Sequence, residues 1–158
     1  MNRFFTADVE NGLQVSMSLN FQSVVQNAVV LCIDDDPVIL ECEQKFLETF
    51  GYTVLTALSG RKGLELASVH SVDLVIVDYY MPEMNGPEVA IEIRRLRPRA
   101  PVIMLSGAVD IPEKDLQVVD AFVMKDRLGS QLLPVIAELR NGRVSNGLML
   151  TGKGISAC

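Results

Sequence analysis

Five short apolar runs alternate along the chain with segments that carry helix signals, and this alternation limits the possible folds more than any other feature of the sequence. Residues 29–33 and 73–77 are almost continuously apolar and rich in β-branched residues, which is typical of strands buried on both faces. Strands that alternate with helices predict a parallel sheet covered by helices on both faces. We therefore expect an α/β fold with a doubly wound, five-stranded parallel sheet.

Turn and cap residues divide the chain into these elements. The predicted strands span residues 29–33, 52–57, 73–77, 102–105 and 122–124, and the predicted helices span 37–50, 60–70, 87–97, 112–119 and 132–140. Asp36 is expected to cap the first helix, with Pro37 at its first position and Gly51 at its end. Pro134 is compatible with the last helix only if that helix begins near Ser130, within one turn of the proline.

The sequence pattern changes near both ends of the chain. Residues 1–27 show no clean hydrophobic period, the alternation begins at Ala28, and the segment after Asn141 carries four glycines and little charge. The length suits one domain with a buried core. We expect an N-terminal extension at 1–27, one domain at 28–141 and a flexible C-terminal tail at 142–158.

Cysteine usage and hydropathy predict a cytoplasmic protein without a membrane partner. No signal peptide is recognisable, and no apolar stretch approaches the roughly 20 residues that span a bilayer. The three cysteines, Cys32, Cys42 and Cys158, are scattered, so we expect no disulfide and a reducing compartment. Cys32 and Cys42 are interpreted as small core residues.

The charge balance argues against nucleic acid as a partner. The chain has 14 Lys and Arg against 20 Asp and Glu, a net charge of −6, and no basic run. Nucleic-acid binding needs clustered cations that replace the counterions of the phosphates. Proteins are therefore the expected partners.

Polar side chains follow four of the five predicted strands. Asp34 and Asp35 come after the first strand, Asp78 after the third, Ser106 after the fourth and Lys125 after the fifth. The carboxyl ends of parallel strands meet in one crevice, so these side chains are expected to converge. Three adjacent carboxylates imply a divalent cation or raised pKa values, and hard oxygen ligands suit Mg²⁺. With a metal, the hydroxyl and the ammonium could neutralise a phosphoryl group on an oxygen nucleophile.

Four segments carry a family resemblance, each at a predicted strand end. They are IDDDP at 33–37, VDYYMPEMNG at 77–86, PVIMLS at 101–106 and FVMK at 122–125. With these segments in this order, residues 28–141 resemble a response-regulator receiver domain of two-component signalling, of the stand-alone type. The resemblance implies the flavodoxin-like fold of receivers.

The resemblance also implies a role for each matching residue. Asp78 would accept a phosphoryl group from the phosphohistidine of a partner kinase. Asp35 and Asp78 would bind Mg²⁺ directly, Asp34 would bind it through water, and the backbone carbonyl of Tyr80 would complete the protein ligands.

Signalling would follow from three further residues of the pattern. Ser106 would move toward the phosphoryl oxygens, Lys125 would pair with them, and Phe122 would stand at the aromatic switch position. The implied protein is a phosphoacceptor that assists its own phosphorylation and dephosphorylation, and not a conventional enzyme. Its expected partners are a sensor histidine kinase or phosphotransfer protein, a downstream protein target and a second copy of the chain in a homodimer.

Three positions depart from the receiver pattern. Asp126 follows Lys125 where the family usually has proline, and Gly107 follows Ser106 where alanine is usual. Lys125 lies only 19 positions after Ser106, which implies a shortened fourth helix.

Two alternatives remain open at this point. Asp34 and Asp36 imitate the nucleophile and acid of a haloacid-dehalogenase-type phosphohydrolase. That class needs a further acidic pair after the lysine, whereas Asp126 stands alone there, and it leaves Asp78 unexplained. The second alternative is a degenerate receiver that acts only as a binding module.

Overall fold

A five-stranded parallel sheet forms the centre of the molecule. The computed structural model describes residues 28–108 and 110–142. The strands are β1 (Val29–Ile33), β2 (Thr53–Ala57), β3 (Leu74–Asp78), β4 (Val102–Ser106) and β5 (Ala121–Met124). All neighbouring pairs are parallel, in the order β2-β1-β3-β4-β5. The predicted doubly wound α/β fold is confirmed.

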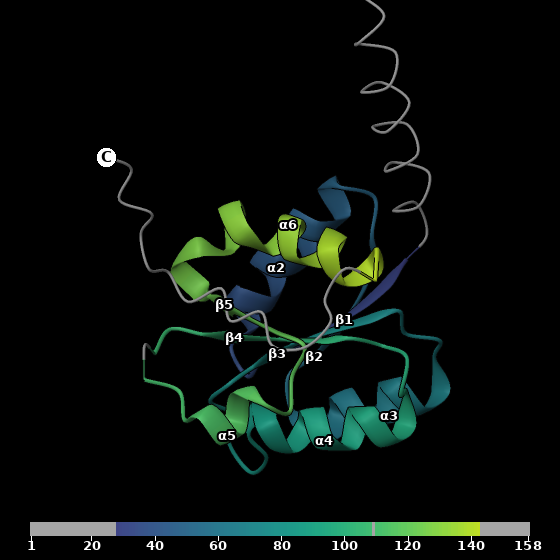
Figure 1. Ribbon diagram of the computed structural model, residues 1–158. Helices are drawn as coiled ribbons and strands as arrows, with labels where there is room; N and C mark the ends of the chain where they lie inside the picture. The colour runs from purple at the N-terminus through teal and green to yellow at the C-terminus, as the bar shows by residue number, and fades with distance from the viewer. Residues whose placement is uncertain (1–27, 109, 143–158) are drawn as a thin grey trace, which may run out of the picture.

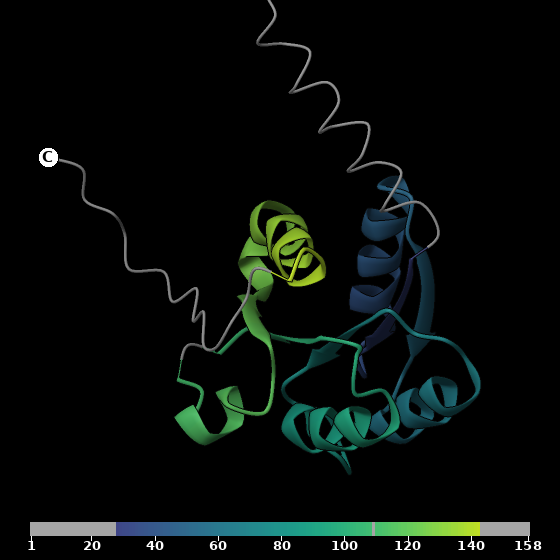
Figure 2. The same ribbon diagram turned by 45° about the vertical axis from the view of Figure 1, so that its right-hand side comes forward.

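Helices cover both faces of this sheet. They are α2 (Pro37–Thr49), α3 (Gly60–Val69), α4 (Gly86–Leu96), α5 (Glu113–Leu116) and α6 (Leu128–Arg140), with a 3₁₀ turn η1 (Lys125–Arg127) before α6. Helices α2 and α6 lie on one face, and α3, α4 and α5 lie on the other (Figure 1). The turned view shows the same two layers, with α5 at the β5 end of its layer (Figure 2).

Side-chain caps set the start of the first three helices. Asp36 accepts hydrogen bonds from the backbone N–H groups of the first turn of α2, and Ser59 does the same for α3. Asn85 and Glu88 form a reciprocal capping box at α4. Gly51 has a φ of 87°, the left-handed conformation expected just after a helix end. These local signals explain why the predicted boundaries of α2 and α3 agree with the structure.

The alternating side chains of β1 supply two separate cores. Val30 and Cys32 pack into the core beneath α2 and α6, whereas Leu31 and Ile33 pack into the core above α3 and α4. All four side chains are essentially inaccessible to solvent. Burial on both faces fixes the position of the strand and of the residues that follow it.

The prediction for the start of the last helix is wrong. Helix α6 begins at Leu128 and not near Ser130, so Pro134 lies inside it. Proline has no N–H, so the carbonyl of Ser130 loses its helical partner. Both residues lie on the exposed side of the helix, where a free carbonyl costs less than it would in the core.

Two smaller expectations are also corrected. Cys32 is buried as predicted, but Cys42 lies on the exposed side of α2. Helix α5 is four residues long, shorter than the predicted 112–119, in keeping with the short spacing between Ser106 and Lys125.

The predicted extension at 1–27 and all but the first residue of the predicted tail at 142–158 lie outside the described residues, so the domain boundaries stay predictions. Within the described part of the chain, no helix has both the length and the apolar character needed to span a membrane.

The close approach of α3 to β1 yields the first prediction. A Cβ atom on Gly63 would lie 2.8 Å from Cγ1 of Ile33, so Gly63→Ala should lower the free energy of unfolding by about 1–3 kcal/mol through overpacking. A Cβ on Gly129 in α6 would meet nothing within 4 Å, so Gly129→Ala should leave stability unchanged or raise it by up to about 1 kcal/mol. Urea unfolding of both variants checks this, and equal effects would contradict the packing described.

Candidate functional site

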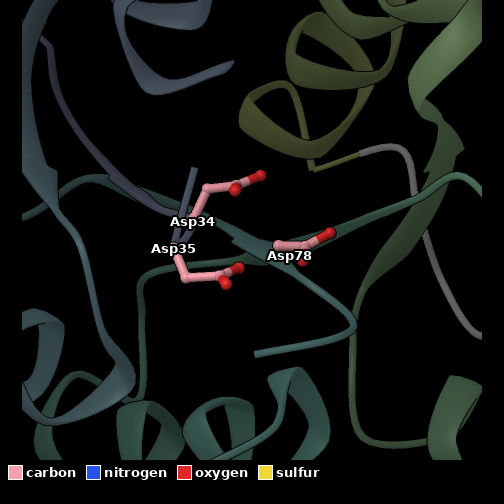
Figure 3. Close-up of side chains that lie close together, drawn as sticks. All are labelled: Asp34, Asp35 and Asp78. Atoms are coloured by element: carbon pink, nitrogen blue, oxygen red, sulfur yellow. The ribbon is translucent and has the colours of Figure 1, made fainter. Parts of the chain in front are cut away.

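Three carboxylates meet at the carboxyl ends of two neighbouring strands. Asp34 and Asp35 directly follow β1, and Asp78 is the last residue of β3, which pairs with β1. Each offers an oxygen atom, and these atoms lie within 4.8 Å of one another. The three side chains extend toward the same side of the sheet edge (Figure 3). The convergence expected from the strand ends is therefore present for these residues.

The three acids differ in their exposure to solvent. The exposed fraction is 1% for Asp34 and 7% for Asp78, whereas Asp35 is exposed. Asp34 is held from within its own loop, because its Oδ1 accepts a hydrogen bond of 2.9 Å from the backbone N–H of Asp36. The cluster thus has a buried side and a side open to solvent.

Lys125 connects the two buried acids. Its Nζ donates to Oδ2 of Asp34 at 2.6 Å and lies 2.8 Å from Oδ1 of Asp78. The lysine directly follows β5 and its side chain is about one-quarter exposed. A single ammonium group is therefore shared by carboxylates that belong to two other strands.

Burial and the hydrogen bonds of Lys125 act in opposite directions on the pKa values of Asp78 and Lys125. Burial raises the pKa of Asp78, the hydrogen bond from Lys125 opposes that rise, and the net direction is upward. Burial acts to lower the pKa of Lys125, but the hydrogen bonds to Asp34 and Asp78 outweigh it, and the net direction is also upward. Repulsion from the neighbouring carboxylates raises the pKa of Asp78 less than burial does.

Ser106 lies on the other side of Asp78, at the end of β4. It is 1% exposed, and its Oγ accepts a hydrogen bond of 2.9 Å from the backbone N–H of Ala108. In the β3–β4 register Asp78 is opposite Leu105, so Ser106 is one residue further along the neighbouring strand. Ser106 thus ends the strand next to that of Asp78, and its hydroxyl oxygen is bound within its own loop.

The two aromatic residues named from the sequence differ in their burial. The side chain of Tyr80 is 65% exposed, and its ring packs edge-on against that of Tyr79 with centroids 4.5 Å apart. Phe122 on β5 is half-buried and packs against the core on the α3–α4 side. Asp126 follows Lys125 within η1, and every peptide bond in the described residues is trans.

The loop that leads from Asp78 to α4 depends on a glycine. The backbone N–H of Gly86 donates to the carbonyl of Tyr79 at 3.0 Å. A Cβ at Gly86 would lie 2.5 Å from the backbone oxygen of Asp78. Only glycine lets the start of α4 pack this closely under the site.

The sequence interpretation missed a buried acid beneath the cluster. Glu43 on α2 is 2% exposed, and its Oε1 lacks a hydrogen-bond partner among the described residues. Burial, followed by the charge of Asp34, raises the pKa of Glu43 to about 8. Its position on the buried stripe of α2 with Leu40 and Leu47 was the signal available, because a charged residue at that spacing interrupts an apolar face.

The donor set fits a hard divalent cation. Carboxylate oxygens are the protein ligands that Mg²⁺ prefers, and an exposed side leaves room for the waters that this ion retains. Three carboxylates face one ammonium group, so the cluster carries an excess of negative charge that a cation would offset.

Comparison with known proteins decides the family. A family model of the response regulator receiver domain matches residues 30–126. The chain belongs to this family. A solved CheY-like receiver domain from Methanospirillum hungatei is similar, with a TM-score of 0.68, 28% identity and coverage of 75% of this chain and 98% of that one.

A second solved receiver contains a metal complex. Response regulator TrrA from Thermotoga maritima, solved with Mg²⁺-BeF, has 31% identity and a TM-score of 0.67, with coverage of 71% of this chain and 98% of that one. Among curated proteins, the transcriptional regulatory protein GlrR of Escherichia coli is 42% identical over 86 residues. That match covers 54% of this chain and only 19% of GlrR, so the likeness concerns the receiver part of that protein.

The geometry also bears on the phosphohydrolase alternative. That interpretation requires Asp36 as a catalytic acid, but Asp36 is exposed and its Oδ1 accepts from the N–H groups of Val38 and Ile39. Asp36 is therefore a helix cap outside the cluster, and Asp78, which that alternative leaves without a role, lies at its centre.

The raised pKa of Glu43 predicts a specific pH dependence of stability. Its pKa of about 8 in the folded protein lies above the ordinary 4.5, so between these values the folded state keeps a proton that the unfolded chain loses. The contribution of Glu43 to the free energy of unfolding should therefore fall as pH rises through this window, by up to about 1.4 kcal/mol per pH unit. Glu43→Gln removes this slope, so the variant should gain stability relative to wild type as pH rises.

Urea unfolding across this pH window measures the effect. Glu48→Gln, an exposed acid on the same helix, is the control and should run parallel to wild type. A Glu43→Gln profile that also runs parallel to wild type would show that Glu43 is not protonated in the folded protein.

Proposed function

We propose that this receiver domain accepts a phosphoryl group on Asp78 from the phosphohistidine of a sensor histidine kinase or phosphotransfer protein, and signals to a protein partner by a conformational change. The observation that carries this proposal is the position of Asp78. It lies within the acidic cluster and shares the ammonium group of Lys125 with Asp34.

The transfer step needs an ionised Asp78. An oxygen of its carboxylate forms the bond to phosphorus, the bond from phosphorus to the histidine nitrogen breaks, and the electron pair stays on that nitrogen. Burial raises the pKa of Asp78 and so disfavours the nucleophilic form, whereas the hydrogen bond from Lys125 favours it. The lysine therefore helps to keep a buried acid available as a nucleophile.

Mg²⁺ is the proposed cofactor. Asp35 and Asp78 would bind it directly, Asp34 through water, and the backbone carbonyl of Tyr80 would complete the protein ligands. When bound, the ion neutralises charge on the phosphoryl oxygens. Lys125 is already at the rim of this site and would pair with a phosphoryl oxygen, at the expense of its present contact with Asp78.

The proposed switch starts at Ser106. Its hydroxyl oxygen now accepts from Ala108, and donation by the same hydroxyl to a phosphoryl oxygen would move the loop that follows β4. Phe122, half-buried on the neighbouring strand β5, would change its packing as the loop moves. A ligand that stabilises one of two arrangements in this way shifts their populations.

The partners and location are also proposals. We propose a protein target, because a net charge of −6 disfavours binding to the phosphates of a nucleic acid. A second copy of the chain is a further proposed partner, and the proposed location is the cytoplasm. Residues 1–27 and 142–158 are proposed to be extensions of the receiver at 28–141.

Incubation with a small phosphodonor, followed by mass spectrometry, tests the function. We expect one added phosphoryl group at Asp78 when Mg²⁺ is present, and little or none with chelator, because the acidic cluster repels an anionic donor. Asp78→Asn should abolish the modification, whereas Asp110→Asn, which removes an exposed acid elsewhere, should not. Similar yields in Asp78→Asn and wild type, or with chelator and Mg²⁺, would contradict the proposal and leave a receiver that only binds partners.

A further inference from the structure

The residue after the proposed phosphoacceptor makes a long-range contact. Tyr79 directly follows Asp78, and its hydroxyl donates to Oδ2 of Asp115 in α5 at 2.8 Å. The two residues are 36 positions apart in the sequence. The contact therefore joins the residue after β3 to α5, the helix that follows the loop after β4.

Tyr79 is a firm anchor point. Its side chain is 9% exposed and belongs to the core under α3 and α4. Its backbone N–H donates to the carbonyl of Leu105 at 2.9 Å, and its carbonyl accepts from Gly86 at 3.0 Å. The backbone of Tyr79 is therefore fixed between β4 and the start of α4.

Helix α5 has few contacts of its own apart from this one, although Ile111 before it and Val118 and Val119 after it pack against the core on the α3–α4 side. It has four residues and none of them is buried. A helix of one turn is not stable by itself in water, so its position depends on tertiary contacts. Leu116 is only partly buried against the neighbouring core.

A second anchor lies beyond the end of α5. Arg94 of α4 donates through Nε to the carbonyl of Val118 at 2.9 Å, and its NH2 group lies 3.2 Å from Oδ1 of Asp120. These contacts hold the residues that lead into β5. The Tyr79 hydroxyl is thus the anchor on α5 itself, and Arg94 is the anchor behind it.

The chemistry of the contact favours its persistence. A hydrogen bond to a carboxylate is stronger than one between neutral groups. Asp115 is half-buried, so its bond to the Tyr79 hydroxyl is partly shielded from water.

We propose that Tyr79 is a positioning residue that tethers α5 to the strand end carrying Asp78 and holds the helix in its unphosphorylated position. This inference rests on the proposed function. The loop after Ser106 leads to α5, so movement of Ser106 toward a phosphoryl group would pull on the start of the helix. The tether to Tyr79 opposes that pull and sets how readily α5 moves.

Tyr79→Phe tests the tether because it keeps the ring and removes the hydroxyl. Without a phosphodonor, amide exchange at Leu116 and Gln117, whose N–H groups form the bonds of α5, should accelerate by roughly 10- to 100-fold, the effect of losing one hydrogen bond to a charged group. The α5 amide shifts should also move toward the positions that wild type reaches only with Mg²⁺ and beryllofluoride, a phosphoryl mimic.

Matched variants separate the tether from a general loss of packing. Tyr52→Phe removes the hydroxyl of a tyrosine in the core beneath α2 and α6, on the other face of the sheet, and should leave exchange in α5 as in wild type. Asp115→Ala should reproduce Tyr79→Phe, and the double variant should add nothing further, because both partners serve one bond. Asp115→Asn keeps an acceptor and should restore most of the protection, whereas Glu113→Ala on the same helix should have no effect.

The experiment tests the tether separately from the proposed function. If beryllofluoride binds wild type and Tyr79→Phe alike, and Tyr79→Phe keeps the wild-type α5 shifts and exchange rates, the proposed function stands and the tether is wrong. If beryllofluoride leaves the wild-type spectrum unchanged, the proposed function is wrong and the coupling to Asp78 is wrong with it.

Discussion

The ammonium group of Lys125 pairs with two carboxylates, those of Asp34 and Asp78. Without it, the fold would hold these two like charges close together with no cation between them. Asp34, Asp78 and Lys125 come from the ends of three different strands, and a third acid, Asp35, lies within the same cluster. The strand order puts β1 beside β3 and places β5 one strand beyond β4. The site therefore forms only when β1, β3, β4 and β5 are assembled, and the repulsion between its carboxylates opposes that assembly.

The rest of the molecule is arranged to hold this cluster in place. Strands β3 and β4 are buried along their whole length, so their ends cannot move apart without opening the core. Gly63 lets α3 pack closely on Ile33 just before the acidic pair, and Gly86 does the same for α4 beneath Asp78. Glu43 lies under the site as a further acid, and burial keeps it protonated at neutral pH. The folded state thus tolerates costly polar groups near the site because tightly packed strands surround them.

Much of this could be predicted from the sequence because the signals are local. Short apolar runs, Asp36 and Ser59 as caps and Gly51 as a helix end all act within a few residues, and the ends of parallel strands must share one edge. Family membership of residues 30–126 agrees with that interpretation. The contact between Tyr79 and Asp115 could not be predicted, since nothing in either segment specifies the distance between them in space. The burial of Glu43, the exposure of Cys42 and the position of Pro134 inside α6 likewise depend on how the helices are rotated and where α6 begins.

The central claim is that Asp78 belongs to an acidic cluster whose charge a divalent cation offsets, and denaturant unfolding of wild type and Asp78→Asn tests it most directly. Burial raises the folded-state pKa of Asp78, so its ionised form costs stability at neutral pH when no metal is bound. With chelator, Asp78→Asn should therefore be more stable than wild type. Added Mg²⁺ should stabilise wild type more than the variant, because a ligand of the folded state adds stability in proportion to its binding. A variant that is less stable than wild type with chelator, and that gains as much from Mg²⁺, would contradict the account.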